Sequence, residues 1–496
     1  MIFGCCAMLW AATAHAEWRK AESPHFVIYS DGDEATLRLY VQRLHAFDTA
    51  LRVRLDRLRA PAGRPLPIYL VRDVAALQIA GPGFPETVKG FYTSGSDDVF
   101  AVAVRASGAD EVLKHEYVHH FMLQHFPYAY PAWLVEGMAE YFMAGEIGRN
   151  QVTIGHPNTG RMGWLVNAGW IPLDTLLTRR PADLYKEENA VAMYYAQAWL
   201  LTHYMMSDAA RMKQLTTYMQ AVGEKGADPQ AALAAATGVP LPELERRLRQ
   251  YLKAGAVTSQ AITGSGFQAP PIKITVLPPS AEEVLLAEQA VKRGPPQKLR
   301  PTYLAKARAA AAKYPGDRLA QVALARAELK LGERTAGEAV LKTLLAASPS
   351  DTEALVMLAR SRMELGEAET DAARRRGLFK EAQSHAARAM NLDQDEYQTL
   401  MAWVRSRSVE PGYPREADVE AQLKALEIAP QLAGLRIETA RNLLRLNKPD
   451  YARFVLTPLL NDPHAREPAA AARQLLDTVK AGQPQAPTAA PRAPGS

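Results

Sequence analysis

Residues 115–119 read HEYVH and residues 133–140 read WLVEGMAE, and these two stretches decide the expected fold and chemistry of the chain. In a helix, His115 and His119 lie one turn apart on one face, so their imidazoles can converge on one metal ion. Glu116 points elsewhere, towards the open coordination position, where a general base must reach a water molecule. The first stretch therefore predicts a helix that carries two metal ligands and a catalytic carboxylate.

Both stretches are expected to be helical. Apolar side chains recur through residues 110–125, Asp110 is a suitable N-cap, and Pro127 ends the helix. A second helix is predicted for residues 133–142, with Pro131 just before its start. The metal ligands would therefore come from two neighbouring helices.

Two glutamates of the second helix complete the expected site. Glu136 and Glu140 lie one turn apart and should face the same way. Glu136 is the expected third metal ligand. Glu140 is the expected acceptor for the outward N–H of one histidine, which would fix the tautomer and the direction of that ring.

Two further histidines follow closely but are not expected ligands. His125 has the spacing of the pattern HExxHxxGxxH, but Met122 replaces the glycine that would let the chain turn. A helix that continues carries His125 about 240° around from His119. His120 lies about 100° off the ligand face, which suits a packing or substrate-side position better.

The two stretches together resemble the gluzincins, zinc peptidases with two histidines from HExxH and a glutamate from a later helix. HEYVHH followed by PAWLVEGMAEYF is most similar to the bacterial peptidase MA-like proteins. The resemblance implies one zinc ion per chain, held by His115, His119 and Glu136, and hydrolysis of peptide bonds with Glu116 as the base. It also implies that Glu140 supports a ligating histidine.

A third stretch, MYYAQAWLLTH at residues 193–203, resembles the helix that follows the zinc site in this clan. A tyrosine of that helix often donates to the oxyanion of the intermediate, and Tyr195 is the best match, with Tyr194 as the alternative. Taken from the residues alone, the stretch is an aromatic amphipathic helix of the core. The Gly-x-Met-Glu-Asn segment of aminopeptidases has no counterpart here, which favours an endopeptidase.

Residues 1–16 differ from the rest of the chain. A short apolar stretch ends in Ala14-His15-Ala16, which matches the small-x-small cleavage pattern and predicts a secretory signal peptide cleaved after Ala16. No Lys or Arg precedes the stretch, and an N-terminal core helix is the alternative. Both cysteines lie within it, so the mature chain would have neither a disulfide nor a thiolate metal site. The expected location is secreted or periplasmic.

The 496 residues are too many for one core, so two or three domains are expected. Residues 17–255 should form an α+β catalytic domain with a small mixed sheet beside helices. Apolar patterns predict strands at residues 25–30, 66–71, 90–92 and 98–104, and helices at residues 33–59, 190–206 and 241–252. Residues 98–104 are the expected edge strand, which would pair with an extended substrate through backbone hydrogen bonds.

Residues 256–280 are rich in Gly and Pro, which predicts a linker. Beyond them, Pro315 and Pro349 lie 34 residues apart, as do Gly332 and Gly366, which is close to the tetratricopeptide period. Residues 281–480 therefore predict a tetratricopeptide-like helical solenoid with a concave surface for a protein partner, and a generic helical bundle is the alternative. Residues 481–496 are rich in Pro and Ala and are expected to be disordered.

The preferred hypothesis is a secreted or periplasmic zinc metallopeptidase that acts on a peptide or protein substrate and binds a partner through its repeats. The alternatives are a non-catalytic scaffold with a structural or vestigial zinc site, and an envelope-assembly factor that acts on polysaccharide or peptidoglycan machinery. Glu116 favours the enzyme, because a structural zinc site needs no general base. The dispersed net charge of +5 does not indicate nucleic-acid binding, and after residue 16 no apolar run is long enough for a transmembrane span.

Overall fold

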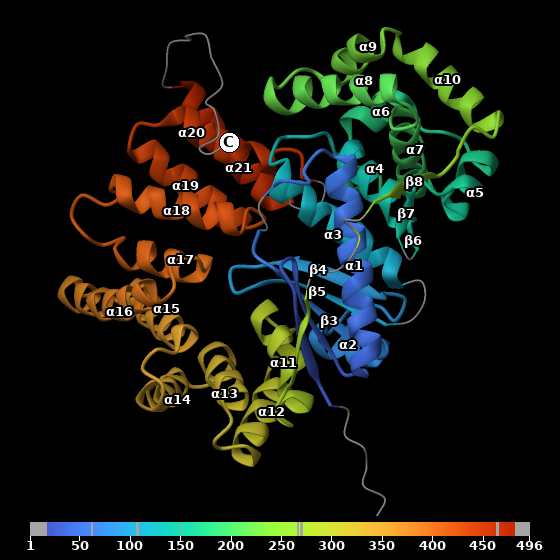
Figure 1. The fold of residues 1–496 in the computed structure, drawn as a ribbon. Helices are drawn as coiled ribbons and strands as arrows, with labels where there is room; N and C mark the ends of the chain where they lie inside the picture. Colours follow the sequence, from blue (N-terminus) through green and yellow to red (C-terminus); the bar gives the residue numbers. More distant parts are fainter. Residues whose placement is uncertain are drawn as a thin grey trace, which may run out of the picture.

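The computed structural model describes residues 17–60, 63–105, 109–148, 150–264, 267, 271–462 and 466–481. The expected signal peptide of residues 1–16 and all but the first residue of the expected disordered tail lie outside the described residues. The described chain is a mixed α+β protein in which helices predominate. An N-terminal part, residues 17–280, is followed by a curved array of helices, residues 281–481, which is called the repeat domain below (Figure 1).

A six-stranded mixed sheet forms the centre of the N-terminal part. Its order is β4-β5-β3-β2-β1-β9. The strands are β1 (Arg19–Glu22), β2 (Phe26–Ser30), β3 (Leu66–Val71), β4 (Gly90–Ser94), β5 (Val99–Val104) and β9 (Lys273–Val276). β2, β3 and β5 run parallel, whereas the other strands pair antiparallel with their neighbours.

Helices cover both faces of this sheet. Ala101 and Ala103 of β5 face α1 (Glu34–Arg54) and α3 (Ala109–His125). The alternate residues of β5 face α2 (Val74–Ala80) and α11 (Ala281–Arg293), the first helix of the repeat domain. A strand covered on both sides is apolar throughout, and every residue of β5 is buried.

The strands predicted at residues 90–92 and 98–104 are present and pair as a hairpin, but the expected place of residues 98–104 at the edge of the sheet is wrong. β4 and β5 pair antiparallel, with Gly90 opposite Ala103 and Ser94 opposite Val99. β5 lies between β4 and β3, so β4 is the edge strand and not residues 98–104. The continuous apolar run of β5 indicates a central strand, whereas the polar end of β4 suits an edge.

The predicted helices are also present; α1 ends at Arg54 and not at residue 59 as expected, and the ends of the others differ by at most one residue. Asp33 caps α1, because its carboxylate accepts from the backbone N–H of Thr36. Asp110 lies within the first turn of α3 instead of capping it. The remaining helices of the N-terminal part are α4 (Ala132–Met143), α5 (Thr159–Asn167), α6 (Leu173–Thr178), α7 (Ala190–Met205), α8 (Ala209–Met219), α9 (Pro229–Thr237) and α10 (Leu241–Lys253).

The expected linker of residues 256–280 contains two strands, which corrects that expectation. β8 (Gln260–Thr263) joins a second, three-stranded sheet with β6 (Glu146–Ile147) and β7 (Gln151–Ile154). β9 extends the main sheet by pairing with β1. The Gly- and Pro-rich composition gave no indication that three isoleucines of this segment pack on the core: Ile262, Ile272 and Ile274. The segment therefore ties the repeat domain to both sheets.

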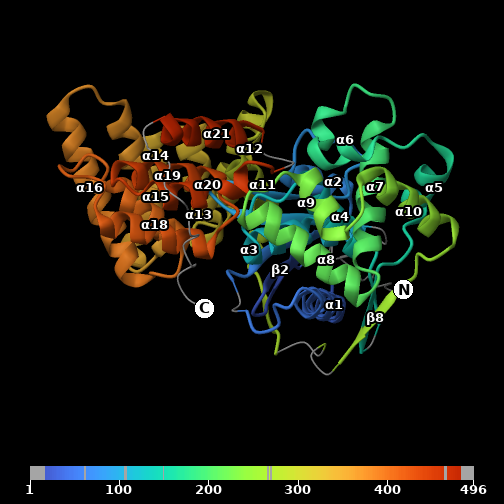
Figure 2. The same cartoon turned by 90° about the horizontal axis from the view of Figure 1, so that it is seen from above.

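The repeat domain consists of successive packed helices that curve into an arc (Figures 1 and 2). They are α11, α12 (Arg300–Lys313), α13 (Arg318–Leu331), α14 (Arg334–Ala347), α15 (Thr352–Ala368), α16 (Ala372–Leu392), α17 (Tyr397–Ser406), α18 (Glu416–Ile428), α19 (Ala433–Arg445), α20 (Pro449–Leu456) and α21 (Arg466–Ala481). Asp317 and Asp351, 34 residues apart, cap α13 and α15 in the same way. A Cβ on Gly366 would come within 2.7 Å of Phe379 in the next helix, so a small residue is needed there. This arrangement is that of a helical solenoid.

Both ends of the arc contact the N-terminal part. Leu285 of α11 shares a core cluster with Val71 of β3, and Asn461 donates to the carbonyl of Ala129 just after α3. Within the described residues, no helix combines the length and the apolar content that a membrane crossing requires.

Candidate metal centre

His115, His119 and Glu136 lie together where α3 packs against α4. The Nε2 atoms of the two histidines are 3.1 Å apart. Glu136 Oε2 lies 3.4 Å from Nε2 of His115 and 3.6 Å from Nε2 of His119. Among the described residues, these are the side chains whose donor atoms are grouped closely enough to hold a metal ion.

The three separations fit a tetrahedral ion. Zinc–ligand distances of about 2.0–2.1 Å place two ligand atoms of a tetrahedron about 3.3–3.4 Å apart. The observed separations of 3.1, 3.4 and 3.6 Å lie around this value. Two imidazole nitrogens and one carboxylate oxygen leave a fourth position open, as in catalytic zinc sites and unlike closed structural sites.

The electrostatics of this group favour a bound cation. Glu136 is fully buried, and a buried carboxylate needs a positive partner. Burial lowers the pKa of His115, but the hydrogen bond and charge of Glu136 outweigh this effect, with help from Glu140 and Glu116, so that the pKa is raised overall. The negative potential of these carboxylates, which raises the pKa of His115, also favours a bound metal ion.

Glu140 and Arg161 support the ligands from behind. Glu140 Oε1 lies 3.5 Å from Nδ1 of His115, the ring nitrogen that does not face Glu136. Arg161 in the first turn of α5 donates to both oxygens of Glu140, with Nε and Nη2 each at 2.8 Å. Asn158 caps α5 by accepting from the backbone N–H of Arg161, which fixes where that side chain begins. The buried Glu140 signals that a cation must be near, but no sequence pattern assigns that role to Arg161.

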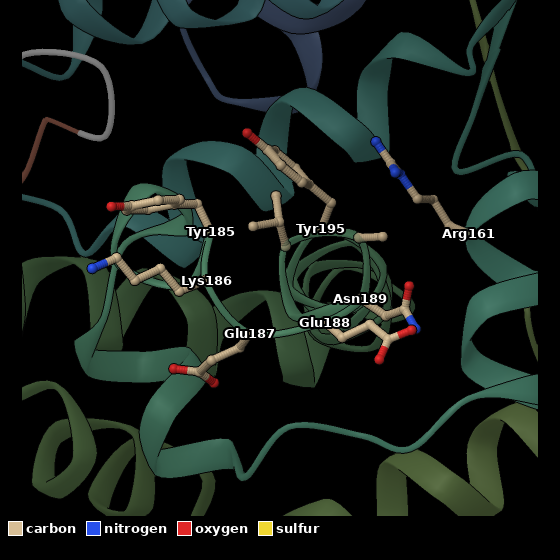
Figure 3. Close-up of a pocket in the computed structure, with 9 residues that line it drawn as sticks. Arg161, Tyr185, Lys186, Glu187, Glu188, Asn189 and Tyr195 are labelled. Carbon is tan, nitrogen blue, oxygen red and sulfur yellow. The ribbon is translucent and has the colours of Figure 1, made fainter.

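Tyr194 and Tyr195 are neighbours on α7 with different surroundings. Tyr194 is fully buried and donates to the carbonyl of Arg179 at 2.9 Å. The ring of Tyr195 lies against the guanidinium group of Arg161, with 5.2 Å between the ring centroid and Cζ. Tyr195 and Arg161 both line a cavity of about 610 Å³ at the start of α7, which residues 185–189 also line (Figure 3). Tyr195 is therefore the tyrosine on the side of the metal centre.

The charge of Glu116 acts on one tyrosine of the edge strand β4 and on one tyrosine of α7. Burial is the main cause that raises the pKa of Tyr92 on β4, and the charge of Glu116 raises it further. Burial also raises the pKa of Tyr195, followed by the charges of Glu136, Glu140 and Glu116. One carboxylate of α3 is therefore within electrostatic range of both tyrosines.

His120 and His125 point away from this group. The hydroxyl of Tyr92 lies 3.2 Å from His120 Nδ1, which also accepts from the side chain of Gln431 at 3.1 Å. The ring of His125 packs against Phe121, with centroids 4.4 Å apart. Burial lowers the pKa of His120 to about 3 and that of His125 to about 4, so both are neutral near pH 7.

Comparisons with known proteins leave the chemistry of this centre unassigned. Residues 111–227, which include most of α3 and all of α4 and α7, match a family model described as a protein of unknown function (DUF1570). No curated protein matches the sequence. A solved structure of a thermophilic TPR protein from Thermus thermophilus is similar at 20% identity with a TM-score of 0.35, and the match covers 40% of this chain and 98% of that one.

Proposed function

We propose that the chain is a zinc-dependent endopeptidase in which His115, His119 and Glu136 hold one zinc ion and Glu116 is the general base. The observation that carries this proposal is the triangle of donor atoms, with sides of 3.1, 3.4 and 3.6 Å, beside an additional carboxylate. A structural site has no use for that carboxylate. The signal-peptide pattern of residues 1–16 extends the proposal to a secreted or periplasmic enzyme.

Each residue of the centre has a defined task in hydrolysis. A zinc ion would supply Lewis acidity, which polarises the scissile carbonyl and makes a water acidic enough to lose a proton near neutral pH. Glu116 takes that proton and later delivers it to the leaving amine. Tyr195 keeps its hydroxyl proton because burial raises its pKa, so it can donate to the oxyanion.

The pair of Glu140 and Arg161 acts on the ligands and not on the substrate. Glu140 lies 3.5 Å from Nδ1 of His115 and would accept from it, which would leave the Nε2 lone pair directed at the ion. Arg161 donates to both oxygens of the buried Glu140 and so compensates its negative charge. Loss of either partner would loosen the direction of the His115 ring.

The repeat domain favours a second candidate, a scaffold with a vestigial zinc site. Helical solenoids present extended surfaces to protein partners and carry no chemistry of their own. In this alternative Glu116 would have no task, so its replacement would change nothing that can be measured on peptides.

Two measurements on the purified chain distinguish the candidates. Bound zinc is quantified, and cleavage of a diverse peptide mixture is followed by mass spectrometry for the wild type and Glu116→Gln. Glu111→Gln is the matched control, since Glu111 is exposed on the same helix. We expect one zinc per chain in all three proteins, cleavage by the wild type and the control, and at least about a thousandfold loss in Glu116→Gln. Zinc binding without cleavage by any form would refute the peptidase, and equal cleavage by all forms would refute the role of Glu116.

A further inference from the structure

Residues 95–98 form the turn between β4 and β5, and this turn lies against the repeat domain. Side chains of α11, α13, α15 and α17 contact it, and they are called the inner face of the repeat domain below. Asp97 forms ion pairs with Lys330 of α13 and with Arg360 of α15, the latter at 2.9 Å. Arg360 also donates to the carbonyl of Ser96. Gln398 of α17 donates to the carbonyl of Asp97 at 2.6 Å. Three of these helices thus hold one turn by its carboxylate and its backbone.

The neighbouring Asp98 is held as firmly. Its carboxylate accepts from Lys292 of α11 at 2.9 Å and from Arg64 at 3.1 Å. Burial raises the pKa of Asp98, but the charges of Lys292 and Arg64 outweigh it and lower the pKa overall. The turn is therefore bound as a dianion.

The ion pairs of Asp98 with Lys292 and of Asp97 with Arg360 are largely shielded from solvent, whereas Lys330 is 35% exposed. The side chains of Asp97 and Arg360 are 13% and 17% exposed, and that of Asp98 is 9% exposed. Removing one partner of a buried pair leaves the other charge uncompensated, which makes the contact costly to open. This part of the inner face is occupied by the chain itself, so a protein partner of the repeats would bind elsewhere on them.

β4, the strand before this turn, also contacts α3, the helix that carries His115 and His119. Tyr92 in the middle of β4 lies 3.2 Å from His120, the residue after the ligand His119. Gln431, from the segment between α18 and α19, reaches the same nitrogen of His120 at 3.1 Å. The repeat domain therefore holds β4 at its turn and contacts α3 directly at the point where β4 meets it.

We propose that Asp97 is a positioning residue for the metal centre: anchored in the repeat domain, it holds the edge strand β4 against α3, the helix of His115 and His119, and so positions extended peptide substrates. The part of this proposal that concerns substrates rests on the proposed peptidase function. The part that concerns β4 is independent of that function, because it states only that Asp97 keeps this strand in place. The repeat domain then serves as a support for the catalytic cleft.

The test compares Asp97→Asn, which keeps the shape and removes the charge, with Asp97→Glu, which keeps the charge. Gln398→Ala is a milder variant that removes one hydrogen bond and no charge, in case Asp97→Asn does not fold. Glu367→Gln is the matched control, because Glu367 forms an exposed ion pair with Arg405 elsewhere in the repeat domain. All variants are made in the full chain.

Hydrogen exchange is the readout that does not depend on activity. We expect the amides of residues 90–94 to exchange at least about tenfold faster in Asp97→Asn, and to a smaller degree in Gln398→Ala, whereas residues 66–71 of β3 and the bound zinc stay unchanged. Asp97→Glu and Glu367→Gln should exchange like the wild type. Unchanged exchange at β4 in both Asp97→Asn and Gln398→Ala would overturn the proposal.

Kinetics test the consequence for substrates. For a peptide long enough to lie along β4, we expect KM to rise about tenfold in Asp97→Asn with kcat within about twofold of the wild type, because uniform binding is lost. A short substrate that spans only the scissile bond should show no change in KM. Faster exchange at β4 with an unaltered KM for the long peptide would overturn the substrate part alone. A wild type that cleaves nothing would instead refute the peptidase function and leave the exchange result to decide the role of Asp97.

Discussion

Arg161 and Glu140 form a bidentate ion pair in which both nitrogen–oxygen distances are 2.8 Å. Glu140 in turn contacts Nδ1 of the candidate metal ligand His115. Glu140 is 1% exposed, so without a cation it would be a buried charge. Burial lowers the pKa of Arg161, but its hydrogen bonds with Glu140 raise it overall. The charge of Arg161 therefore compensates the buried carboxylate that lies behind His115.

We predict that Arg161→Gln weakens zinc binding by about 10- to 100-fold, the usual effect of losing a partner behind a metal ligand. Arg161→Lys should give a smaller loss, because it keeps the charge but not the planar fork. Competition with a chromogenic chelator measures both. Arg246→Gln is the control, since Arg246 forms a bidentate ion pair of the same kind with Glu243 on the exposed surface of α10. An unchanged zinc affinity in Arg161→Gln would refute this role.

The identity of the ligands gives a second prediction. His119→Gln should lose at least about a hundredfold in zinc affinity, because it removes one of three donor atoms. His120→Gln should keep zinc at one per chain, since His120 contacts Tyr92 and Gln431 on another side of α3. Atomic emission of the purified proteins measures the metal content. Zinc loss in His120→Gln, in a protein that remains folded by circular dichroism, would contradict the ligand set.

Local periodicity explains why most of the candidate site could be predicted from the sequence. His115 and His119, and likewise Glu136 and Glu140, are one helical turn apart, so their shared direction follows from helix geometry alone. The same geometry directs His125 away. The place of β5 in the sheet, the pairing of β9 with β1 and the contact of Arg161 with Glu140 depend on long-range packing. No spacing rule connects those partners, and the Gly- and Pro-rich composition of residues 256–280 concealed two short strands.

The close approach of α4 and α7 supports a third prediction. A Cβ on Gly137 would lie 2.6 Å from the carbonyl oxygen of Ala198, so one helix must shift. Gly137→Ala should therefore destabilise the chain by about 2 kcal/mol and lower kcat/KM, because α4 carries Glu136 and α7 carries Tyr195. Gly163→Ala is the control, since nothing lies within 4 Å of that position in α5. It should stabilise by about 0.5–1 kcal/mol in urea unfolding. Equal stability of the two variants would contradict the close packing.

A cluster of partly buried histidines, His25, His45 and His125, gives a fourth prediction, for acid stability. His25 Nε2 lies 3.5 Å from Asp48, whose carboxylate also accepts from Arg52 and Tyr117, each at 2.7 Å. Burial is the main cause that lowers the pKa of His25 and of the adjacent His45. For His125 it lowers the pKa to about 4, and the charge of Arg52 adds to this effect.

The direction of this pH effect follows from the linkage between proton binding and unfolding. A histidine whose pKa is lower in the folded state than in the unfolded state binds more protons when unfolded, so its contribution to stability is present above about pH 6.5 and is lost as the pH falls towards the folded pKa. Replacing His125 by Gln removes one such group. Between about pH 7 and 5, the free energy of unfolding of His125→Gln should therefore decline less than that of the wild type, by about 1 kcal/mol once solvent screening is allowed for. Urea unfolding at a series of pH values measures the difference, and His156→Gln, outside this cluster, should follow the wild type. If the free energy of unfolding of His125→Gln and of the wild type fell in parallel with pH, the partly buried histidines would not be a cause of the loss of stability in acid.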